Sequence, residues 1–370
     1  MRILAAFDSF KESMSAYEAG QAVKSACGKS IDVDITPMAD GGEGTMSAIN
    51  SALSGTVHEV NVTGPQFNNV TAKISIAGDL AVIESAQACG LEYVKEEDKD
   101  AQVMTTYGVG ELIKYVIERG VKKILITLGG SATNDGGIGM LTALGAKFLD
   151  LDGQPVMPSG MGLKSIDSID VIDMKKLIEG VTFEGLCDVD NPLVGRKGAT
   201  FIFGGQKGIA KEDMPRIDGE MRAYARLSAQ VNGTDVQNVK GAGAAGGLGF
   251  AILSYLHGKL VKGIDEVIRL TKLEEHVQKA DLIFTGEGSM DEQTLMGKTP
   301  YGVLMVAKKY NKPVIGFAGK ITNRDALLEA GFTDVLCINH ESMPLRKMLG
   351  RGRMNLEREV RAYLEAHHYV

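Results

Sequence analysis

Residues 124–137 read Ile-Leu-Ile-Thr-Leu-Gly-Gly-Ser-Ala-Thr-Asn-Asp-Gly-Gly, and this pattern indicates an α/β fold. The β-favouring residues 124–128 predict a buried strand, and the segment 138–144 predicts a helix. The glycines between them let the backbone turn sharply and approach a ligand closely. A strand, a polar glycine-rich loop and a helix N-terminus form a place where backbone N–H groups can bind an anion. An ordinary glycine-rich turn is the alternative.

Four other loops lie where a predicted strand ends or an apolar helix begins. They are Asp8-Ser9-Phe10-Lys11, Asp40-Gly41-Gly42-Glu43-Gly44, Thr285-Gly286-Glu287-Gly288 and Gly241-Ala242-Gly243-Ala244-Ala245-Gly246-Gly247. In open α/β sheets, ligands bind just beyond the carboxyl ends of the strands. Because glycine loses much entropy on folding, so many glycine-rich loops need a reason. A shared ligand-binding cleft is the simplest explanation.

Length and composition limit the classes of protein that this chain can represent. A chain of 370 residues with 44% apolar residues favours two packed domains. The net charge of −7, with no basic block, argues against nucleic-acid or membrane-surface partners. The four cysteines are widely spaced, which argues against a disulfide scaffold or a thiolate zinc site. No apolar run is long enough to span a bilayer, and the chain begins with a predicted strand, so we expect a cytoplasmic protein.

Strands and helices alternate at both ends of the chain, and the middle differs. The terminal strands are predicted at 2–7, 32–38, 281–285, 313–317 and 333–338, and the helices that follow them at 12–28, 42–53, 299–310, 323–331 and about 345–366. This alternation predicts a doubly wound parallel sheet of flavodoxin-like order. The segments 56–62, 70–76 and 80–84 predict an antiparallel meander, followed by a helix at 108–119 and the strand at 123–128. We therefore expect an inserted mixed α/β domain over residues 61–280, within a discontinuous domain of residues 1–60 and 281–370.

Two familiar nucleotide-binding motifs are present only in part. Residues 241–246 fit the pattern GxGxxG, and Asp265 follows about 20 residues later, but residues 236–240 make a poor strand. Residues 297–299, Gly-Lys-Thr, resemble the end of a P-loop, yet Glu292 occupies the position where that motif requires glycine. A phosphate would therefore be bound by a different kind of loop, and a dinucleotide site remains a minor alternative.

Residues 187–192 read Cys-Asp-Val-Asp-Asn-Pro and follow a strand-like segment. Asp188 and Asp190 share one face if the strand continues through them. Two close carboxylates can bind Mg²⁺ or accept a proton from a hydroxyl, whereas an Asx-turn at the end of the strand is the structural alternative.

Lysines and further polar residues near the loops have two interpretations. Lys11 follows the first strand beside Asp8 and Ser9, which favours a phosphate contact. Lys207 lies in the glycine turn 204–208, where a phosphate contact or a solvated side chain would both fit. Residues 291–298, which include Asp291, Gln293 and Lys298, form either part of the site or a solvated face.

Eight motifs in this order resemble the bacterial glycerate kinase family, of the glycerate 2-kinase type, and the resemblance covers nearly the whole chain. The motifs are residues 8–11, 38–45, 105–112, 129–137, 187–193, 205–208, 241–247 and 285–288. One departure lies after the last motif, where members of the family carry Arg-Ile-Asp-Ser-Gln-Thr. This chain has Ser-Met-Asp-Glu-Gln-Thr at 289–294, so a guanidinium–phosphate contact at position 289 is missing.

The resemblance implies a flavodoxin-like domain with an inserted restriction-enzyme-like domain, and ATP-dependent phosphorylation of D-glycerate to 2-phosphoglycerate in a cleft between them. It implies ATP and Mg²⁺ as cofactors and D-glycerate as the small-molecule partner; the sequence leaves the oligomeric state, and which loop holds ATP, open. The expected catalytic residues are Asp190, Asp188 and Lys11, with Asp188 and Asp190 also as metal ligands. The expected binding residues are Asp8, Ser9, Asp40, Glu43, Gly129, Gly130, Ser131, Thr133, Asn134, Asp135, Asn191, Lys207, Glu287, Asp291, Gln293 and Lys298.

Two other classes of function stay open at this point. The glycines at 241–246 would suit an NAD-dependent dehydrogenase of a small hydroxy acid. A non-catalytic ligand-sensing module would also use strand-end loops, although the many carboxylates and lysines argue against a simple binder of an acid. Phosphoryl transfer requires an in-line hydroxyl and neutralisation of the developing charge, which these residue types can provide.

Overall fold

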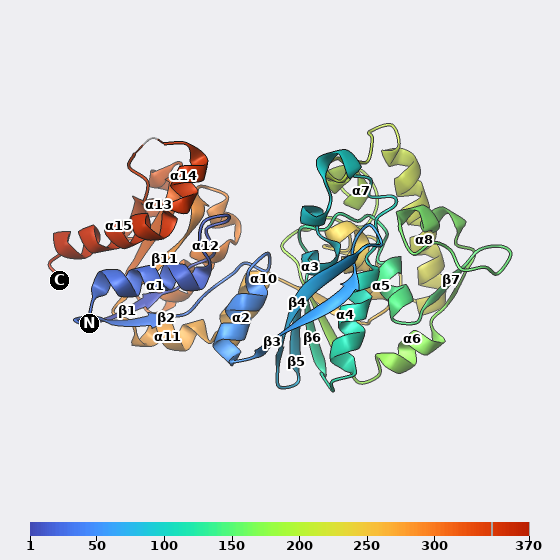
Figure 1. Ribbon diagram of the computed structural model, residues 1–370, viewed down its shortest axis with the longest axis horizontal. Coiled ribbons are helices and arrows are strands. Elements are labelled where there is room, and N and C mark those ends of the chain that lie inside the picture. Colours follow the sequence, from blue (N-terminus) through green and yellow to red (C-terminus); the bar gives the residue numbers. More distant parts are fainter. Residues whose placement is uncertain (342, 370) are drawn as a thin grey trace. The chain divides into compact units, whose positions relative to one another are not determined.

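The computed structural model describes residues 1–341 and 343–369 (Figure 1). Contacts between residues divide the chain into two compact units. Unit 1 comprises Met1–Ser54 and Gly263–Val370, and unit 2 comprises Gly55–Lys262. The inserted domain was expected to end at residue 280, but unit 2 ends at Lys262. Helices α10 (Gly263–Leu270) and α11 (Leu273–Lys279) belong to unit 1 because they pack against its helices α2 (Thr45–Leu53) and α12 (Thr299–Lys309).

Unit 1 contains a five-stranded sheet in which all pairs are parallel. The strand order is β13-β12-β11-β1-β2. The strands are β1 (Arg2–Ala5), β2 (Asp32–Ile35), β11 (Leu282–Met290), β12 (Val314–Ile321) and β13 (Asp334–Cys337). The prediction of five parallel strands for this part of the chain is confirmed.

Helices cover both faces of this sheet, as a parallel sheet requires (Figure 1). Side chains of α1 (Ala16–Cys27) and α15 (Gly352–Ala366) form one apolar core with alternate residues of β1 and β11. Helices α11 and α12 (Thr299–Lys309) pack on the sheet as well. The remaining helices of the unit are α2 (Thr45–Leu53), α13 (Arg324–Ala330) and α14 (Leu345–Gly350).

Two predictions for unit 1 are wrong in detail. The predicted helix at about 345–366 is two helices, α14 and α15, which are separated at Arg351, the C-cap residue of the first and the N-cap residue of the second. The glycine-rich segment 285–288 is not a loop but part of β11. Gly286 is required in this strand because a Cβ there would lie 1.9 Å from the carbonyl oxygen of Phe317 on β12.

Unit 2 contains a six-stranded mixed sheet of order β10-β9-β6-β5-β4-β3. The first three strands along the chain are antiparallel and the others are parallel, which confirms the predicted meander. The strands are β3 (Thr56–Thr63), β4 (Asn69–Ala77), β5 (Leu80–Glu84), β6 (Lys123–Thr127), β9 (Thr182–Leu186) and β10 (Lys259–Val261). A small antiparallel pair, β7 (Lys147–Leu149) and β8 (Ser168–Asp170), was not predicted.

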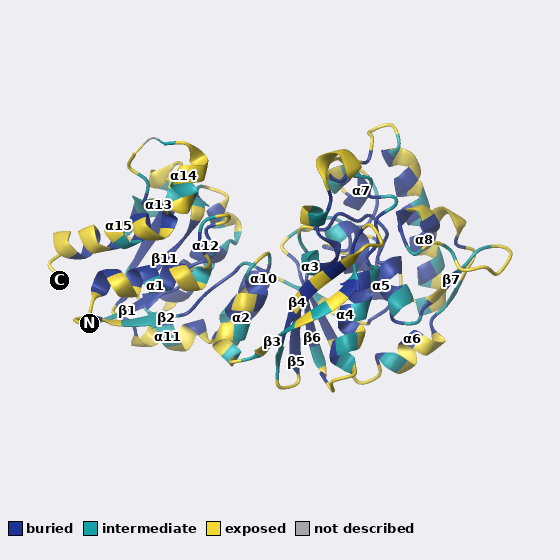
Figure 2. Cartoon of the chain, in the orientation of Figure 1, coloured by how far each residue is buried: buried dark blue, intermediate teal, exposed yellow. Residues whose placement is uncertain are grey.

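The helices of unit 2 pack around this sheet and around a buried aromatic group. Tyr224, Phe250 and Tyr255 are almost fully buried and lie in ring contact with one another. Strands β5 and β6 are almost entirely buried, and Figure 2 shows the outer face of helix α8 (Met214–Asn232) exposed. The helices are α3 (Ala86–Cys89), α4 (Tyr107–Ile117), α5 (Ile138–Ala143), α6 (Ile172–Leu177), α7 (Ala199–Phe203), α8 (Met214–Asn232) and α9 (Leu248–Ser254).

The GxGxxG segment has no strand before it in this fold. Residues 236–240 form turns, and the segment continues through the short 3₁₀ helix Ala244–Gly247 into α9. The strand–turn–helix context of a dinucleotide-binding site is therefore missing at this segment.

The other features expected from composition can be examined directly. Within residues 1–341 and 343–369, no helix is both long and apolar enough to cross a lipid bilayer. Cys27, Cys89, Cys187 and Cys337 are all free thiols.

Candidate active site

Three carboxyl groups of unit 1 gather at the carboxyl ends of adjacent strands, and we call Asp8, Asp40 and Glu287 the carboxylate cluster. Asp8 follows β1, Asp40 follows β2, and Glu287 lies in the later part of β11. These strands are neighbours in the sheet, with β1 in the middle. The charges of Asp40 and Glu287 both act on Asp8. The cluster therefore lies where an open α/β sheet binds its ligand.

Asp8 is the most perturbed member of the cluster. Its side chain is buried, and burial together with the charge of Asp40 raises its pKa from about 3.8 to about 7. Two donors oppose this effect: the Thr299 hydroxyl donates to Oδ2 at 2.5 Å, and the Ser9 N–H donates to Oδ1 at 2.6 Å. A carboxyl group with a pKa near neutrality can hold or release a proton, or bind a cation that removes the repulsion.

Glu287 faces the start of α12 on the other side of the cluster. Burial raises the pKa of Glu287, and the charge of Asp40 adds to this rise. The Thr294 hydroxyl donates to Oε1 at 2.7 Å, and the half-buried Lys298 Nζ lies 3.4 Å from Oε2. Lys298 is the N-cap residue of α12, so an ammonium group and a helix N-terminus both adjoin the carboxylates.

The other residues predicted for unit 1 surround the cluster or form turns near it. Lys11 and Glu43 are exposed, and Asp40 accepts a hydrogen bond from the Gly42 N–H at 3.1 Å. Asp291 accepts from the Gln293 N–H at 2.8 Å, which makes the pair a turn. Sequence reasoning missed Thr299, whose only signal is its position at the first turn of a helix before a proline.

In unit 2, the glycine-rich loop 129–137 is held from within by Asp135. Asp135 is fully buried and accepts hydrogen bonds from the Thr106 N–H and hydroxyl at 2.9 and 2.7 Å. It also accepts from the N–H groups of Gly137 and Gly139 at 2.9 and 3.3 Å, at the start of α5. Burial raises the pKa of Asp135, and these donors oppose that rise.

Lys207 braces the same loop rather than lying in solvent. It is 4% exposed, and its Nζ donates to Ser131 Oγ at 2.9 Å and to the Thr133 carbonyl at 2.8 Å. Burial lowers its pKa to about 8. The interpretation of Lys207 as a solvated side chain is therefore wrong.

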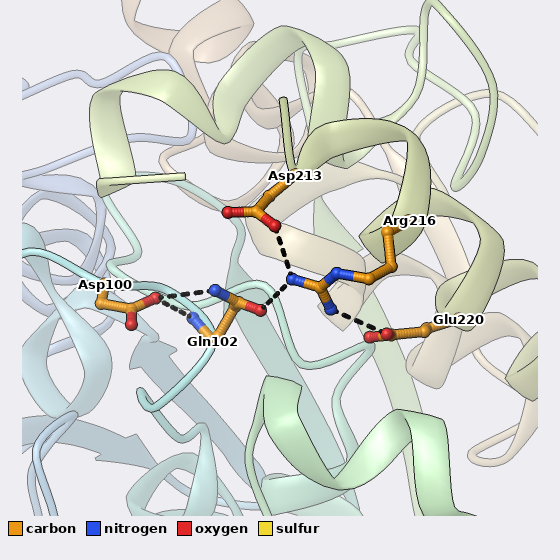
Figure 3. A network of polar contacts seen from close by, with 5 residues as sticks. All are labelled: Asp100, Gln102, Asp213, Arg216 and Glu220. Carbon is orange, nitrogen blue, oxygen red and sulfur yellow. Dashed lines mark hydrogen bonds and ion pairs between the residues drawn. The ribbon is translucent and has the colours of Figure 1, made fainter. Parts of the chain in front are cut away.

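A polar network on the surface of unit 2 supports the backbone at Lys207 (Figure 3). Arg216 of α8 donates to Asp213, to Glu220 and to the side chain of Gln102. The Gln102 N–H in turn donates to Asp100 at 3.0 Å. Between these two residues, the Ala101 N–H donates to the Lys207 carbonyl at 2.9 Å. The network fixes the turn that holds the Lys207 segment.

Only the first part of loop 129–137 is accessible. Gly130 is exposed and Gly129 is half-buried, whereas Ser131, Thr133 and Asn134 are each 3% exposed or less. The side-chain NH₂ of Asn134 donates to the Thr200 hydroxyl at 3.0 Å. The four polar side chains of the motif therefore shape the loop, and Gly129–Gly130 is the part that a ligand can reach.

Asp188 and Asp190 do not continue a strand, so the predicted common strand face is wrong. Strand β9 ends at Leu186, and both aspartates lie in the irregular segment that follows and are exposed. Asp190 accepts from Lys240 Nζ at 2.7 Å, and the Asn191 side chain donates to the Lys197 carbonyl at 2.8 Å. The segment breaks from the strand because Pro192 and the Asn191 bond favour a turn.

The donor chemistry of unit 1 suits Mg²⁺. In the part of the chain that the structure describes, no three His, Cys, Asp or Glu side chains form a ready-made metal group. Magnesium in phosphoryl-transfer sites needs only one or two protein carboxylates, because water and substrate phosphates complete its shell. Burial and then the charge of Asp40 raise the pKa of Asp8, and a cation bound there would neutralise the acidic charge.

Fold and site together define an α/β enzyme whose charged side chains gather at the ends of parallel strands. Residues 3–367 match the model of the glycerate kinase family. The chain is 42% identical over 368 residues to a glycerate kinase of Bacillus subtilis (strain 168), covering 98% of this chain and 96% of that protein. It is 44% identical over 329 residues to a glycerate 2-kinase of Escherichia coli (strain K12), covering 87% and 86%.

A solved structure agrees with these sequence matches. The crystal structure of a candidate glycerate kinase 2 from Salmonella typhimurium LT2 matches with a TM-score of 0.89 at 40% identity, covering 100% of both chains. This chain belongs to the glycerate kinase family, and it is therefore a kinase, an enzyme that transfers a phosphoryl group to an alcohol.

Proposed function

We propose that this enzyme uses ATP to phosphorylate D-glycerate at its 2-hydroxyl group, giving 2-phosphoglycerate. The name of the Escherichia coli relative, glycerate 2-kinase, supports the position of transfer. The observation that carries the proposal is Asp8, a buried carboxyl group with a pKa near 7 beside two other acidic groups at the ends of parallel strands. A site with this uncompensated negative charge suits a nucleotide that arrives with a metal cation.

The domain description belongs to the same proposal. Renumbered within unit 1, the strand order is 2-1-3-4-5, which is the flavodoxin-like order. The mixed sheet of unit 2, with its antiparallel edge, supports an inserted restriction-enzyme-like domain. Asp8 follows β1 and Glu287 lies in the later part of β11, and these are the two strands between which the order reverses, which is the ligand-binding point of such sheets.

Unit 1 is the proposed site of the ATP phosphates. Asp8 and Asp40 would hold Mg²⁺, which supplies neutralisation of phosphate charge when bound. Lys298 and the N–H groups at the start of α12 would contact phosphate oxygens directly. Lys11, exposed at the end of the β1 loop, would contact the same phosphates, and Ser9, Glu43 and Gln293 would line the approach to them. Glu287 orients Lys298.

Unit 2 is the proposed site of the glycerate. Strands β6 and β9 are parallel neighbours, so the segments after them lie at the same edge of the sheet. The N–H groups of the half-buried Gly129 and the exposed Gly130 would bind the substrate carboxylate. Asp190, with Asp188 beside it, would orient or deprotonate the hydroxyl that is phosphorylated. Four free cysteines favour a reducing compartment such as the cytoplasm.

A coupled assay of ADP release tests the proposal. ATP with Mg²⁺ should yield ADP only when D-glycerate is added, and product analysis should find 2-phosphoglycerate. Glycerate-independent ADP release, or none at all, would refute the kinase assignment for this substrate. Reduction of NAD by a hydroxy acid would favour the dehydrogenase alternative instead.

A further inference from the structure

An apolar cavity of unit 1 lies beside the carboxylate cluster and is not used by the site described above. Its volume is about 180 Å³. The residues that line it come from the loop after β1, from β11, β12 and the end of β13, and from α14 and α15. Its apolar walls include Phe10, Ile338, Leu345, Met348 and Leu349.

We propose that this cavity binds the purine base of the nucleotide; the assignment rests on the proposed ATP-dependent function. A volume of about 180 Å³ is below the roughly 300–1,000 Å³ of pockets that enclose whole drug-sized ligands, so the cavity suits one ring system. A nucleobase has two apolar faces and a polar edge. Apolar walls would cover the faces, as they do in most small-molecule sites.

Two glycines open the cavity to a flat ring. Gly288 of β11 and Gly319 of β12 both line it. A Cβ on Gly288 would lie 3.9 Å from the Lys11 nitrogen and 4.0 Å from the Phe10 Cα, so a side chain there fits and would extend into the space. A side chain longer than a methyl group at this position would occupy the place of the ring.

One polar side chain in the wall can meet the edge of a base. Asn339 donates from Nδ2 to the Gly319 carbonyl at 2.8 Å and accepts at Oδ1 from Asn355 at 2.8 Å. Its amide therefore uses one of two N–H groups and one of two lone pairs in these contacts. The Asn355 and Gly319 bonds hold the amide plane fixed, which is what recognition of a planar edge needs.

The charge around the cavity favours a ligand with phosphates. Lys11 and Lys320 line it and are exposed, so two cationic residues adjoin the cavity. The loop Asp8–Lys11 belongs to both places, because Asp8 is in the carboxylate cluster whereas Phe10 and Lys11 line the cavity. A nucleotide with its base in the cavity would extend its phosphates along this loop toward the cluster.

Helix α14 forms one wall of the cavity and is anchored to the β1 loop. The Ser13 hydroxyl donates to the Leu349 carbonyl at 2.6 Å. Leu345, the first residue of this helix, is 68% exposed although it is apolar. A bound ring would cover part of this exposed apolar surface, and removing that surface from water favours binding.

Calorimetric titration of the full chain with ADP, in the presence of Mg²⁺, tests the assignment. Gly288→Val fills the cavity, and Gly350→Val is the matched control, since Gly350 lies next to Leu349, is exposed and has no heavy atom within 4 Å of its Cβ position. We expect Gly288→Val to weaken ADP binding at least about tenfold. Binding of inorganic pyrophosphate should stay as in the wild type, and Gly350→Val should match the wild type for both ligands.

The outcomes distinguish failure of the base-binding proposal from failure of the kinase proposal. If the wild type binds ADP and Gly288→Val binds it equally well, the cavity does not hold the base, and the kinase proposal stands. If the wild type does not bind ADP and does not form ADP from ATP in the presence of D-glycerate, both proposals fail.

Photolabelling of the wild type with 8-azido-ADP gives an answer that does not depend on a variant. Label on peptides containing Leu345–Gly350 or Phe10–Ser13 supports the assignment, and label confined to other peptides overturns it.

Discussion

Asp8 of unit 1 and Asp135 of unit 2 are both buried, and each follows a parallel strand of its sheet, yet their surroundings differ. Asp135 accepts four hydrogen bonds from Thr106, Gly137 and Gly139, and these donors oppose the rise in its pKa that burial causes. Asp8 has two donors and two carboxyl neighbours whose charges oppose its ionisation. The first arrangement stabilises a loop, whereas the second stores repulsion that a bound cation would relieve.

The largest effect should come from Asp8→Asn. The substitution keeps the size of the side chain and an acceptor for Thr299, but it removes the charge proposed to hold Mg²⁺. We expect kcat to fall about 100-fold or more, within the range that a positioned acidic group provides. Steady-state ADP release measures this, with the exposed Asp325→Asn as the matched control. Wild-type turnover in Asp8→Asn would remove Asp8 from the site and break the comparison.

A third aspartate sharpens the comparison because it is exposed. Asp190→Asn should lower kcat about 100-fold if Asp190 orients or deprotonates the hydroxyl. Its ion pair with Lys240 is at the surface, where solvent screens it, so the melting temperature should hardly change. Lys240→Met is the control, since it removes the same ion pair and keeps the carboxylate. Equal losses of kcat in both variants would mean that the ion pair, and not proton transfer, matters.

Asp135→Asn should affect stability rather than chemistry. Its amide nitrogen cannot accept from the buried donors, and leaving one of them unsatisfied costs about 1–3 kcal/mol. Urea denaturation should show this loss, while the exposed Asp152→Asn should be close to wild type. The kcat of folded Asp135→Asn should fall by less than about tenfold, because Asp135 does not touch the substrate and affects the position of Gly129–Gly130 only through the rest of the loop. A variant as stable as the wild type would contradict a structural role.

Sequence patterns predicted much of the fold because its elements are locally encoded. Alternating apolar residues identified the β3–β5 meander, and short apolar runs identified the parallel strands of unit 1. The extension of β11 through Gly286 could not be predicted in this way, because glycine normally indicates a turn. Its cause is a neighbouring strand, since the Phe317 carbonyl leaves no room for a side chain.

The site was predicted as a set of loops but not as a set of contacts. Asp8, Asp40 and Glu287 were each chosen because they follow strands, and no local pattern shows that their charges interact. Burial of Lys207 against Ser131 joins residues 76 apart, so the glycine turn alone suggested a solvated side chain. Asp188 and Asp190 were expected to share one face of a strand, but β9 ends at Leu186, before either residue.

We infer that Asp8 lowers the stability of the protein at neutral pH because it is placed for function. Its pKa is about 7 in the folded state and near 3.8 when unfolded, so the folded state binds the proton more tightly. Stability should therefore fall as pH rises from about 4 to about 7, by up to about 4 kcal/mol at 1.36 kcal/mol for each pH unit. The Asn side chain of Asp8→Asn is neutral at every pH, so this variant should not lose stability in this way as the pH rises.

The direct test is urea denaturation of wild type and Asp8→Asn at pH 5 and pH 8. We predict that the variant is more stable than the wild type at pH 8, by a margin about 2–3 kcal/mol larger than at pH 5, and that it has lost activity. A variant that is less stable than the wild type at both pH values, with no change in the gap, would show that Asp8 is a structural residue like Asp135.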